Sequence, residues 1–429
     1  MEIEITGLTA DGRGVGRLDG MVVFTPGTFP GDQAEIEIIQ QKKRFAMGRL
    51  IRLIKPSADR IEPDCAAVGT CGGCGLLGLS YEAQLRLKRR QVDEALRRIG
   101  GIEGLEAEPV IGMEQPSGYR NKADFHLDRP TGATVAGFFE AGSHVVAESS
   151  QCSLVPKRWS PMIKTICDLL DQIEFVTLKP DTVTLRQSNA GGETMLIFHT
   201  ETVEAGDPWP DFAARLTGPA GPAQSVYLVV EDELCQLSGA DRITERIHGL
   251  DFLISPTSFF QVNTKMAEYL VDSVLKYAGD VAGKRVFDLY CGIGTFTLPL
   301  AKTGAQVIGL EENETAVMDA RENAERIGIE SASFQTGRVE DALPILLKQL
   351  GLPHVVVVDP PRAGLSGQVV EAIIKAAPER IVYVSCDPGT LARDLARFTE
   401  GGYRVSEVQP VDMFPHTLHV ECVVLIQRK

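Results

Sequence analysis

At 429 residues the chain is too long for one ordinary hydrophobic core, so two or three domains are expected. Its 44% hydrophobic and 24% charged residues are typical of a soluble globular protein. No segment approaches the roughly 18 apolar residues of a membrane helix, and the acidic, alternating residues 1–5 are unlike a signal peptide. These features exclude a membrane protein and predict a cytoplasmic one with reduced thiols.

The charge is unevenly distributed along the chain. A net charge of −15 disfavours nucleic acid as a partner, yet residues 1–100 carry 15 Lys and Arg against 13 Asp and Glu. Two basic stretches stand out there: Lys42, Lys43, Arg44, Arg49, Arg52, Lys55 and Arg60, followed by Arg86, Lys88, Arg89, Arg90, Arg97 and Arg98. A local basic stripe can bind phosphates on an acidic protein. RNA-binding surfaces and merely solvated surfaces both remain open.

The N-terminal segment reads as a small all-β module. Short alternating strands are expected at 3–8, 21–25, 33–40 and 44–54, with glycine-rich turns at 12–17 and 26–31. A compact barrel of the OB type fits this pattern, and such barrels commonly bind single-stranded nucleic acid.

Three cysteines then fall within ten residues, at Cys65, Cys71 and Cys74, whereas the other six are scattered. This clustering indicates metal or iron–sulfur binding, and spacing alone does not choose between zinc and a cluster. The radical S-adenosylmethionine pattern Cys-x3-Cys-x2-Cys is absent, because the first gap holds five residues. Four free thiols are the alternative.

The middle of the chain predicts an α+β arrangement. A helix is expected at 81–99, with Leu85, Val92, Leu96 and Ile99 as its apolar stripe. Farther on, strands are expected at 134–139, 182–187, 194–200 and 225–230, with a helix at 157–173.

From residue 246 strands and helices alternate regularly. Strands are expected at 285–290, 305–310, 331–336, 354–359, 380–385, 403–409 and 420–427, with helices that begin near Thr295, Glu314, Val339, Gly367 and Thr390. This order predicts an α/β fold with a mostly parallel, doubly wound sheet. Ligands of such sheets bind at the carboxyl ends of the strands.

The first of these strands runs into Asp288-x3-Gly292-x-Gly294, and Glu311 ends the second strand. Glycines let the backbone approach a ligand closely, and an acidic residue at the end of the second strand can accept both hydroxyls of a ribose. S-adenosylmethionine-dependent methyltransferases show this pairing. A strand–turn–helix without a ligand is the alternative.

Asp359-Pro360-Pro361-Arg362 follows the fourth strand, beside the expected reactive end of the cofactor. Methyltransferases acting on exocyclic amines often have an aromatic residue where Arg362 stands, which argues against amine methylation. RNA cytosine-C5 methyltransferases usually have a cysteine within this motif, where Pro361 stands.

Cys386 ends a buried strand, and Glu421 begins the last one. A thiol nucleophile, a base and a nucleotide-like cofactor would then share one crevice and perform covalent chemistry. The alternatives are a buried structural thiol and a surface carboxylate.

Taken in order, these motifs resemble the RNA 5-methyluridine (uracil-C5) methyltransferases, and specifically their 23S ribosomal RNA branch. The glycine-rich turn and the basic strand after Lys42 resemble its TRAM module. The resemblance is carried further by Cys65-x5-Cys71-Gly-Gly-Cys74 with Cys152, and by residues 258–263, 359–362, 385–394 and 419–421.

The resemblance implies a role for each matched residue. Cys386 would be the nucleophile and Glu421 the base in methyl transfer to C5 of a specific uridine, through a covalent Cys–C6 adduct. S-adenosyl-L-methionine would be bound by Gln261, Tyr290, Thr295, Glu311 and Asp359. A [4Fe-4S] cluster would be bound by Cys65, Cys71, Cys74 and Cys152. Two residues depart from the family pattern: Asp387 and Thr295 stand where asparagine is common, and Asp387 would oppose ionisation of the neighbouring thiol.

Three domains are expected on these grounds. They are a TRAM or OB-like RNA-binding barrel (1–58), a central α+β domain with the cysteine motif (59–246), whose helix at 81–100 packs on the C-terminal domain, and a Rossmann-like, seven-stranded methyltransferase domain (247–429). The expected partner is 23S ribosomal RNA, bound by a monomer. The alternatives are a transfer RNA uracil-C5 methyltransferase, a cytosine-C5 enzyme, and an RNA-binding or ribosome-assembly factor with a vestigial methyltransferase domain.

Overall fold

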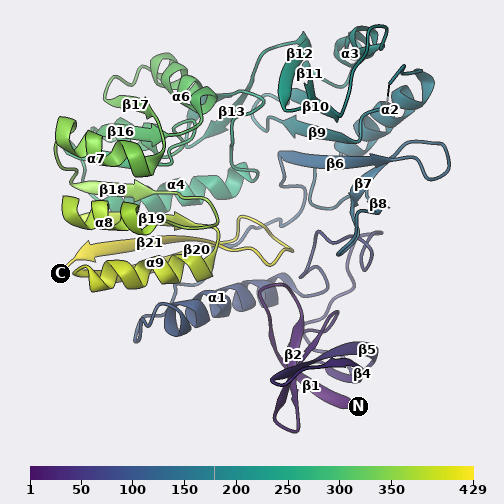
Figure 1. The fold of residues 1–429 in the computed structure, drawn as a ribbon, viewed down its shortest axis with the longest axis horizontal. Helices are drawn as coiled ribbons and strands as arrows, with labels where there is room; N and C mark the ends of the chain where they lie inside the picture. The colour runs from purple at the N-terminus through teal and green to yellow at the C-terminus, as the bar shows by residue number, and fades with distance from the viewer. Residues whose placement is uncertain (178) are drawn as a thin grey trace.

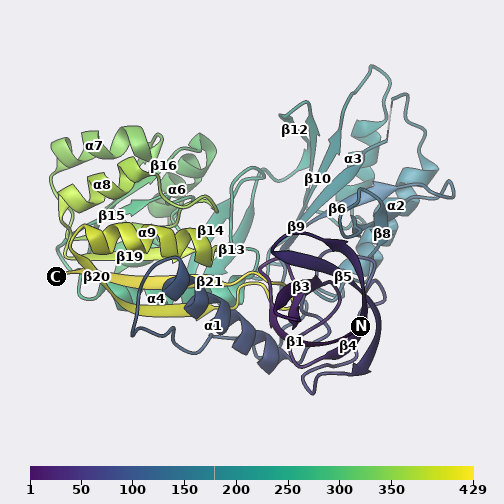
Figure 2. The ribbon, with the colours of Figure 1, turned by 60° about the horizontal axis from the view of Figure 1, so that its bottom comes forward.

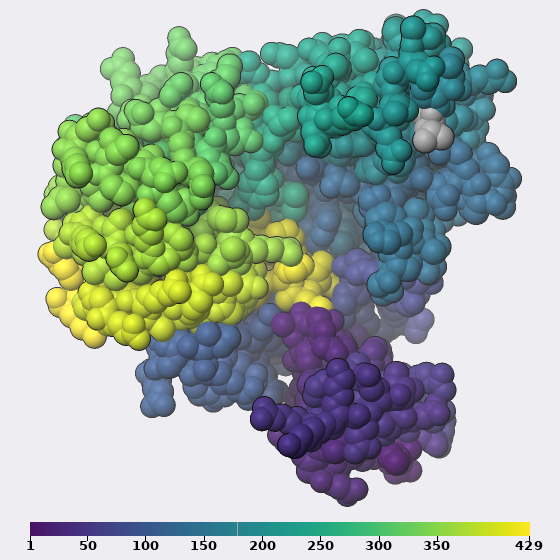
Figure 3. Space-filling view, in the orientation of Figure 1, coloured from purple at the N-terminus to yellow at the C-terminus, as the bar shows by residue number. Residues whose placement is uncertain are grey.

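The computed structural model describes residues 1–177 and 179–429 and has three parts (Figure 1). A small barrel holds the N-terminus, a central sheet follows, and a helix-covered sheet holds the C-terminus. The face shown in Figure 3 is hollowed between the central and C-terminal parts, with C-terminal residues in the hollow. None of the helices in these described ranges is both long and apolar enough to cross a membrane.

The N-terminal part is a closed five-stranded barrel with the order β1-β2-β3-β5-β4. Its strands are β1 (Glu2–Leu8), β2 (Gly14–Leu18), β3 (Met21–Thr25), β4 (Gln33–Gln41) and β5 (Phe45–Lys55). The core inside the barrel is small and aliphatic, and consists of Ile3, Ile5, Val23, Ala34, Ile36 and Ala46. The prediction of an OB-like barrel is confirmed.

The turn predicted at 12–17 is wrong in its second half, because Gly14 begins β2, which pairs with both β1 and β3. The glycines are needed for close packing and not only for turning. A Cβ at Gly14 would lie 2.0 Å from Thr28 Oγ1, and one at Gly16 would lie 2.5 Å from the backbone oxygen of Glu4. Glycine in a strand often marks such a close approach.

The central part is a mixed sheet with the order β12-β11-β10-β9-β6-β7-β8. Its elements are β6 (Lys122–Asp128), β7 (Val135–Phe139), β8 (Val146–Glu148), α2 (Trp159–Gln172), β9 (Thr182–Gln187), β10 (Thr194–Thr200), α3 (Trp209–Thr217), β11 (Ser225–Val230) and β12 (Glu233–Gly239). Aromatic residues of α2 and α3, including Trp159, Trp209 and Phe212, share one core with the sheet. The sequence analysis missed β6, β8, β12 and α3.

The C-terminal part is a seven-stranded sheet with the order β17-β16-β15-β18-β19-β21-β20. Its strands are β15 (Arg285–Leu289), β16 (Gln306–Glu311), β17 (Ala332–Thr336), β18 (Val355–Val358), β19 (Arg380–Ser385), β20 (Tyr403–Val411) and β21 (Glu421–Arg428). Strands β15 to β19 are parallel, and β21 inserts antiparallel between β19 and β20. Separate apolar clusters cover the two faces, as expected for a doubly wound sheet.

Helices on both faces complete this layer. They are α4 (Thr264–Ala278), α5 (Thr297–Lys302), α6 (Glu314–Ile327), α7 (Val339–Leu350), α8 (Gly367–Ala376) and α9 (Pro388–Glu400). The hairpin of β13 (Ile243–Ile247) and β14 (Leu250–Ile254) precedes α4. The predicted alternation and fold class are confirmed.

Helix α1 (Tyr81–Arg98) packs against α9 and β20 of the C-terminal sheet (Figures 1 and 2). Val92 and Leu96 are buried in the core of that sheet. Two features differ from the prediction. Ile99 follows the last turn and is 54% exposed, whereas Lys88, assigned to a basic surface, is 1% exposed. Lys88 is therefore not available to bind phosphate.

Candidate active site

The turn after β15 is held by a carboxylate from the next strand. Glu311 accepts hydrogen bonds from the backbone N–H groups of Gly292, at 3.1 Å, and Asn313, at 2.9 Å. Tyr290 has a φ of +66°, which is rare outside glycine, and Gly292 and Gly294 also have positive φ. Thr295 lies partly buried at the end of this turn. Three of the five residues predicted to bind the cofactor are thus brought together here.

Asp288 is buried beneath the turn. Its Oδ2 accepts a hydrogen bond from Thr297 Oγ1 at 2.5 Å, while its Oδ1 has no hydrogen-bond partner within the described residues. Burial raises the pKa of Asp288 to about 7. A buried oxygen without a partner is costly unless a further group binds it, so the site is suited to a ligand that donates hydrogen bonds.

Asp359 adds another carboxylate at the end of β18. Burial, together with the charges of Asp288 and Glu311, raises the pKa of Asp359 to about 7. Three neighbouring carboxylates that repel one another would be stabilised by a cation. The sulfonium and amino groups of S-adenosylmethionine are cationic, so the residues present fit this ligand.

Gln261 lies in an anchored segment before α4. Its side chain is largely buried, and its backbone oxygen accepts a hydrogen bond from Asn121 Nδ2 at 2.9 Å. Neighbouring Phe260 is in the core, whereas Phe259 is 66% exposed. Phe259 is therefore the accessible aromatic residue of this segment.

Cys386 and Glu421 are neighbours because β19 and β21 pair. Ser385 pairs with Cys422, so the residue after β19 lies beside the first residue of β21. Cys386 is partly exposed, and Glu421 is 4% exposed. Burial and the charge of Asp359 raise the pKa of Glu421 well above its usual value, and Arg362 opposes this shift. The predicted nucleophile and base are therefore neighbours, and the carboxylate of Asp359 acts on both.

The pKa of the Cys386 thiol is raised to about 11 by burial and by the charges of Glu421 and Asp359, against the opposing charge of Arg362. Asp387, which was expected to oppose ionisation, is not one of the leading causes. It caps α9 instead, accepting a hydrogen bond from Thr390 N at 2.7 Å. The positive end of the helix balances a carboxylate at this position.

The four cysteines of the predicted cluster site line one pocket of about 320 Å³. All four are partly exposed free thiols. Burial, with Cys152 and Cys71 as neighbours, raises the pKa of Cys74 to about 12. Within the described ranges, no three His, Cys, Asp or Glu side chains could hold a metal ion together.

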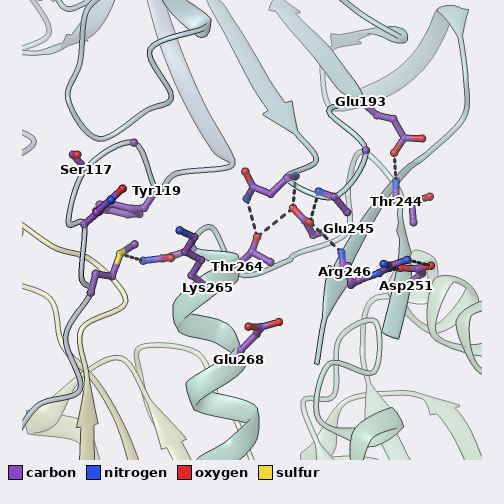
Figure 4. A pocket seen from close by; sticks show the side chains of 17 residues that line it. Ser117, Tyr119, Glu193, Thr244, Glu245, Arg246, Asp251, Thr264, Lys265 and Glu268 are labelled. Atoms are coloured by element: carbon purple, nitrogen blue, oxygen red, sulfur yellow. Dashed lines mark hydrogen bonds and ion pairs between the residues drawn. The ribbon is translucent and has the colours of Figure 1, made fainter. Parts of the chain in front are cut away.

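A larger hollow of about 740 Å³ lies apart from the predicted residues (Figure 4). It is lined by the segment from Met113 to Tyr119, a turn of the central sheet, the β13–β14 hairpin and the start of α4. Its wall is well hydrogen-bonded, since Glu245 accepts from Asn189 N at 2.9 Å and Thr264 Oγ1 at 3.2 Å. None of the predicted catalytic, cofactor-binding or cluster-binding residues lines it.

Comparisons with known proteins identify the family of this chain. The model of the tRNA (Uracil-5-)-methyltransferase family matches residues 242–429, and that of the TRAM domain matches residues 1–51. Uncharacterized RNA methyltransferases of Bacillus cereus and Gloeobacter violaceus are each 38% identical to this chain over 445 residues, covering 100% and 99% of it and 96% of each relative. The chain belongs to the RNA uracil-C5 methyltransferase family.

A solved member of this family has the same fold along its whole length. The tRNA (uracil-54, C5)-methyltransferase of Pyrococcus abyssi, determined with S-adenosyl-L-homocysteine, is 29% identical with a TM-score of 0.78. The match covers 99% of this chain and 100% of that one. This chain is accordingly an S-adenosylmethionine-dependent RNA (uracil-C5) methyltransferase with a TRAM domain.

The burial of two charged residues, Asp288 and Lys88, was not predicted from the sequence. Asp288 heads the quoted glycine motif, but its burial was not anticipated. Lys88 forms an ion pair with Asp412, which was not singled out. The spacing held a signal for Lys88, because a residue four before Val92 lies on the same helix face.

The raised pKa of Cys386 predicts how the free enzyme reacts with iodoacetamide. Only the thiolate reacts, so we expect alkylation of Cys386 to be slow at pH 7 and to accelerate with pH up to about 11. A Glu421→Gln variant should shift this profile to lower pH, because one of the two carboxylates that raise the pKa is gone. Mass spectrometry of the Cys386 peptide measures the rate, and identical profiles would contradict the assigned cause.

Proposed function

We propose that the enzyme methylates C5 of one specific uridine in 23S ribosomal RNA through a transient bond between Cys386 and C6. The observation that carries this proposal is the adjacency of Cys386 and Glu421 across β19 and β21, with Asp359 close to both. One thiol and one carboxylate are the minimum set for this reaction.

The chemistry requires both groups in sequence. C5 of uracil is too weak a nucleophile to take a methyl group unaided. Addition of the Cys386 thiolate to C6 moves the electron pair of the 5,6 double bond towards C5 and O4, which makes C5 nucleophilic. S-adenosylmethionine supplies the electrophilic methyl group. Glu421 then removes the proton from C5, the double bond re-forms, and Cys386 leaves with its electrons.

We assign cofactor binding to Gln261, Tyr290, Thr295, Glu311 and Asp359. Glu311 is suited to the ribose hydroxyls because a carboxylate has about four acceptor positions, and two backbone N–H groups use only part of them. Asp359 is suited to a cationic part of the ligand. A positive charge there would also lower the pKa of Cys386, which favours thiolate formation in the loaded enzyme.

The RNA would lie in the hollow between the central and C-terminal parts. For the three domains we propose the limits 1–58, 59–246 and 247–429. The target base must leave its stack to reach Cys386, and the exposed ring of Phe259 is suited to stack on a neighbouring base. The basic stretch at 42–60 would hold the backbone, so binding should weaken with salt. We infer a monomer that acts in the cytoplasm, where ribosomal RNA is found.

Transfer RNA is the second candidate substrate. The TRAM domain and the cysteine motif resemble those of the ribosomal RNA branch, whereas the matched family model and the Pyrococcus abyssi enzyme, which matches 99% of this chain, are named for transfer RNA. We expect labelled S-adenosylmethionine to label unmodified 23S ribosomal RNA and not transfer RNA, and the digested product to contain 5-methyluridine. Labelled 5-methylcytidine, labelled transfer RNA, or no transfer would each overturn the corresponding part of the proposal.

We further propose that Cys65, Cys71, Cys74 and Cys152 bind a [4Fe-4S] cluster. Thiolates on one zinc ion lie about 2.3 Å from the metal and converge on it, whereas each thiolate of a four-iron cluster binds a different iron. The four thiols line a pocket of about 320 Å³, which leaves room for such a cluster. Its role would be to hold this segment in place, not radical chemistry.

Purification without oxygen is expected to give a brown protein with about four iron atoms per chain. Cys74→Ser should lower the iron content and the thermal midpoint, because it removes one of the four proposed ligands. Cys235→Ser, at an exposed thiol outside the pocket, is the matched control. A colourless preparation that contains zinc would overturn the assignment.

A further inference from the structure

The proposed base is held at the end of a hairpin loop. Strand β20 ends at Val411, which pairs directly with Glu421, the first residue of β21. Residues 412–420 connect the two strands, and we call them the β20–β21 loop. Asp412 follows Val411, so the start of this loop is one residue away from the strand partner of Glu421.

Helix α1 supplies a charged anchor for this loop. Lys88 and Asp412 are 1% and 0% exposed, and Lys88 Nζ lies 2.5 Å from Asp412 Oδ1. Lys88 also donates to the backbone oxygen of Phe414, at 3.0 Å, and Tyr81 Oη donates to Asp412 Oδ2, at 2.9 Å. Burial lowers the pKa of Lys88, and Asp412 opposes this shift.

Hydrogen bonds from three further segments also hold the β20–β21 loop. Tyr119 Oη and Asn263 Nδ2 donate to the backbone oxygens of Pro415 and Met413, both at 3.1 Å. Leu76 N, two residues after Cys74, donates to the backbone oxygen of His416 at 2.9 Å. The β20–β21 loop is therefore fixed from the cysteine segment, α1, the central part and the start of α4.

A buried ion pair contributes little net stability to the attachment of a loop. Desolvation offsets most of its attraction, and apolar residues of similar volume often give equal or greater stability. Such pairs instead define one geometry, because both charges must meet. Asp412 adjoins Val411, the strand partner of the proposed base, and a displacement of about 1 Å in a catalytic group can slow catalysis by about 10²-fold.

We propose that Lys88 and Asp412 are positioning residues that set the place of the Glu421 carboxylate relative to C5 of the bound uracil. The inference rests on the proposed role of Glu421 as the base. Neither residue touches the reacting atoms in this scheme. Helix α1, which lies outside both matched family models, thereby becomes part of the catalytic apparatus.

The test separates positioning from stability by comparing Lys88→Met with the double variant Lys88→Met/Asp412→Asn. The single variant leaves a buried unpaired carboxylate, so both its denaturation midpoint and its kcat should fall. The double variant is neutral and retains an acceptor for Tyr81, so its midpoint should recover. We expect its kcat to stay at least about tenfold low, with KM for RNA within about twofold and with covalent enzyme–RNA adduct accumulating.

A double variant with normal kcat and no adduct would show that the pair is merely structural and overturn the proposal. Should that variant not fold, Tyr81→Phe decides, because it removes the hydrogen bond to Asp412 and the acceptor of Met113 N without removing a charge; a normal kcat there also refutes positioning. Lys164→Met/Asp168→Asn, an exposed pair on α2, is the matched control and should change nothing. Glu421→Gln isolates the underlying assumption: normal turnover in that variant refutes the base, whatever Lys88 does.

Discussion

Replacement of Cys386 by alanine is expected to abolish methyl transfer while S-adenosylmethionine still binds. Without a thiolate on C6, C5 of the uracil is not activated, so the rate should fall by at least about 10⁴-fold. The substitution leaves the carboxylates of Asp288, Glu311 and Asp359 in place, so the affinity for the methyl donor should change by less than about threefold. Single-turnover assays with labelled donor, and calorimetry of donor binding, measure the two effects.

A thiol in a different part of the chain provides the control for this experiment. Cys167 lies in the core of the central part, away from the crevice. Its replacement by alanine should cost stability of about 1 kcal/mol and leave turnover unchanged. Cys386→Ser, which keeps the shape but is a far weaker nucleophile, should be as inactive as the alanine variant. Retained turnover in Cys386→Ala would refute the covalent mechanism outright.

The C-terminal sheet could be predicted closely because its strands are buried on both faces. Continuous apolar runs such as Val355–Val358 mark parallel strands, and helices begin at capping residues such as Asn313 and Ser366. Functional residues follow the strands, so locating the strands also located the candidate site.

The other two parts carried weaker signals. Strand β6 (Lys122–Asp128) alternates with charged residues and reads like a loop, and β12 (Glu233–Gly239) is an exposed edge. Gly14 and Gly16 looked like turn residues, but they serve close packing within the barrel. These residues are placed by contacts with residues outside the short sequence window from which secondary structure is predicted.

The meeting of Cys386 with Glu421 depends on sheet order, which spacing along the chain does not encode. It requires β21 to insert antiparallel between β19 and β20. The burial of Lys88 was not predicted either, because a lysine among arginines on a helix indicates a solvated face. Its partner Asp412, which lowers the cost of burying the charge, lies far away in the sequence. Charges that pair across long sequence separations are what single-sequence reasoning misses.

Glu421→Gln is expected to leave the enzyme covalently bound to its methylated RNA. The amide cannot take the C5 proton, so elimination of Cys386 stalls after the methyl group has been transferred. We expect product release to slow by about 10²- to 10⁴-fold, and a denaturation-resistant adduct to accumulate. A band of retarded mobility that carries both labelled RNA and labelled methyl group on a denaturing gel identifies this species.

The double label distinguishes this defect from simple loss of structure, since a variant with a damaged crevice would form no adduct. Glu407→Gln, which changes a partly exposed carboxylate on β20 paired with Lys276, is the matched control and should turn over normally. The wild-type rate of elimination should rise with pH, because burial and Asp359 raise the pKa of Glu421 and only the ionised carboxylate accepts the proton. If Glu421→Gln instead releases product at the normal rate, another group removes the proton, and the adjacency of Cys386 and Glu421 no longer accounts for catalysis.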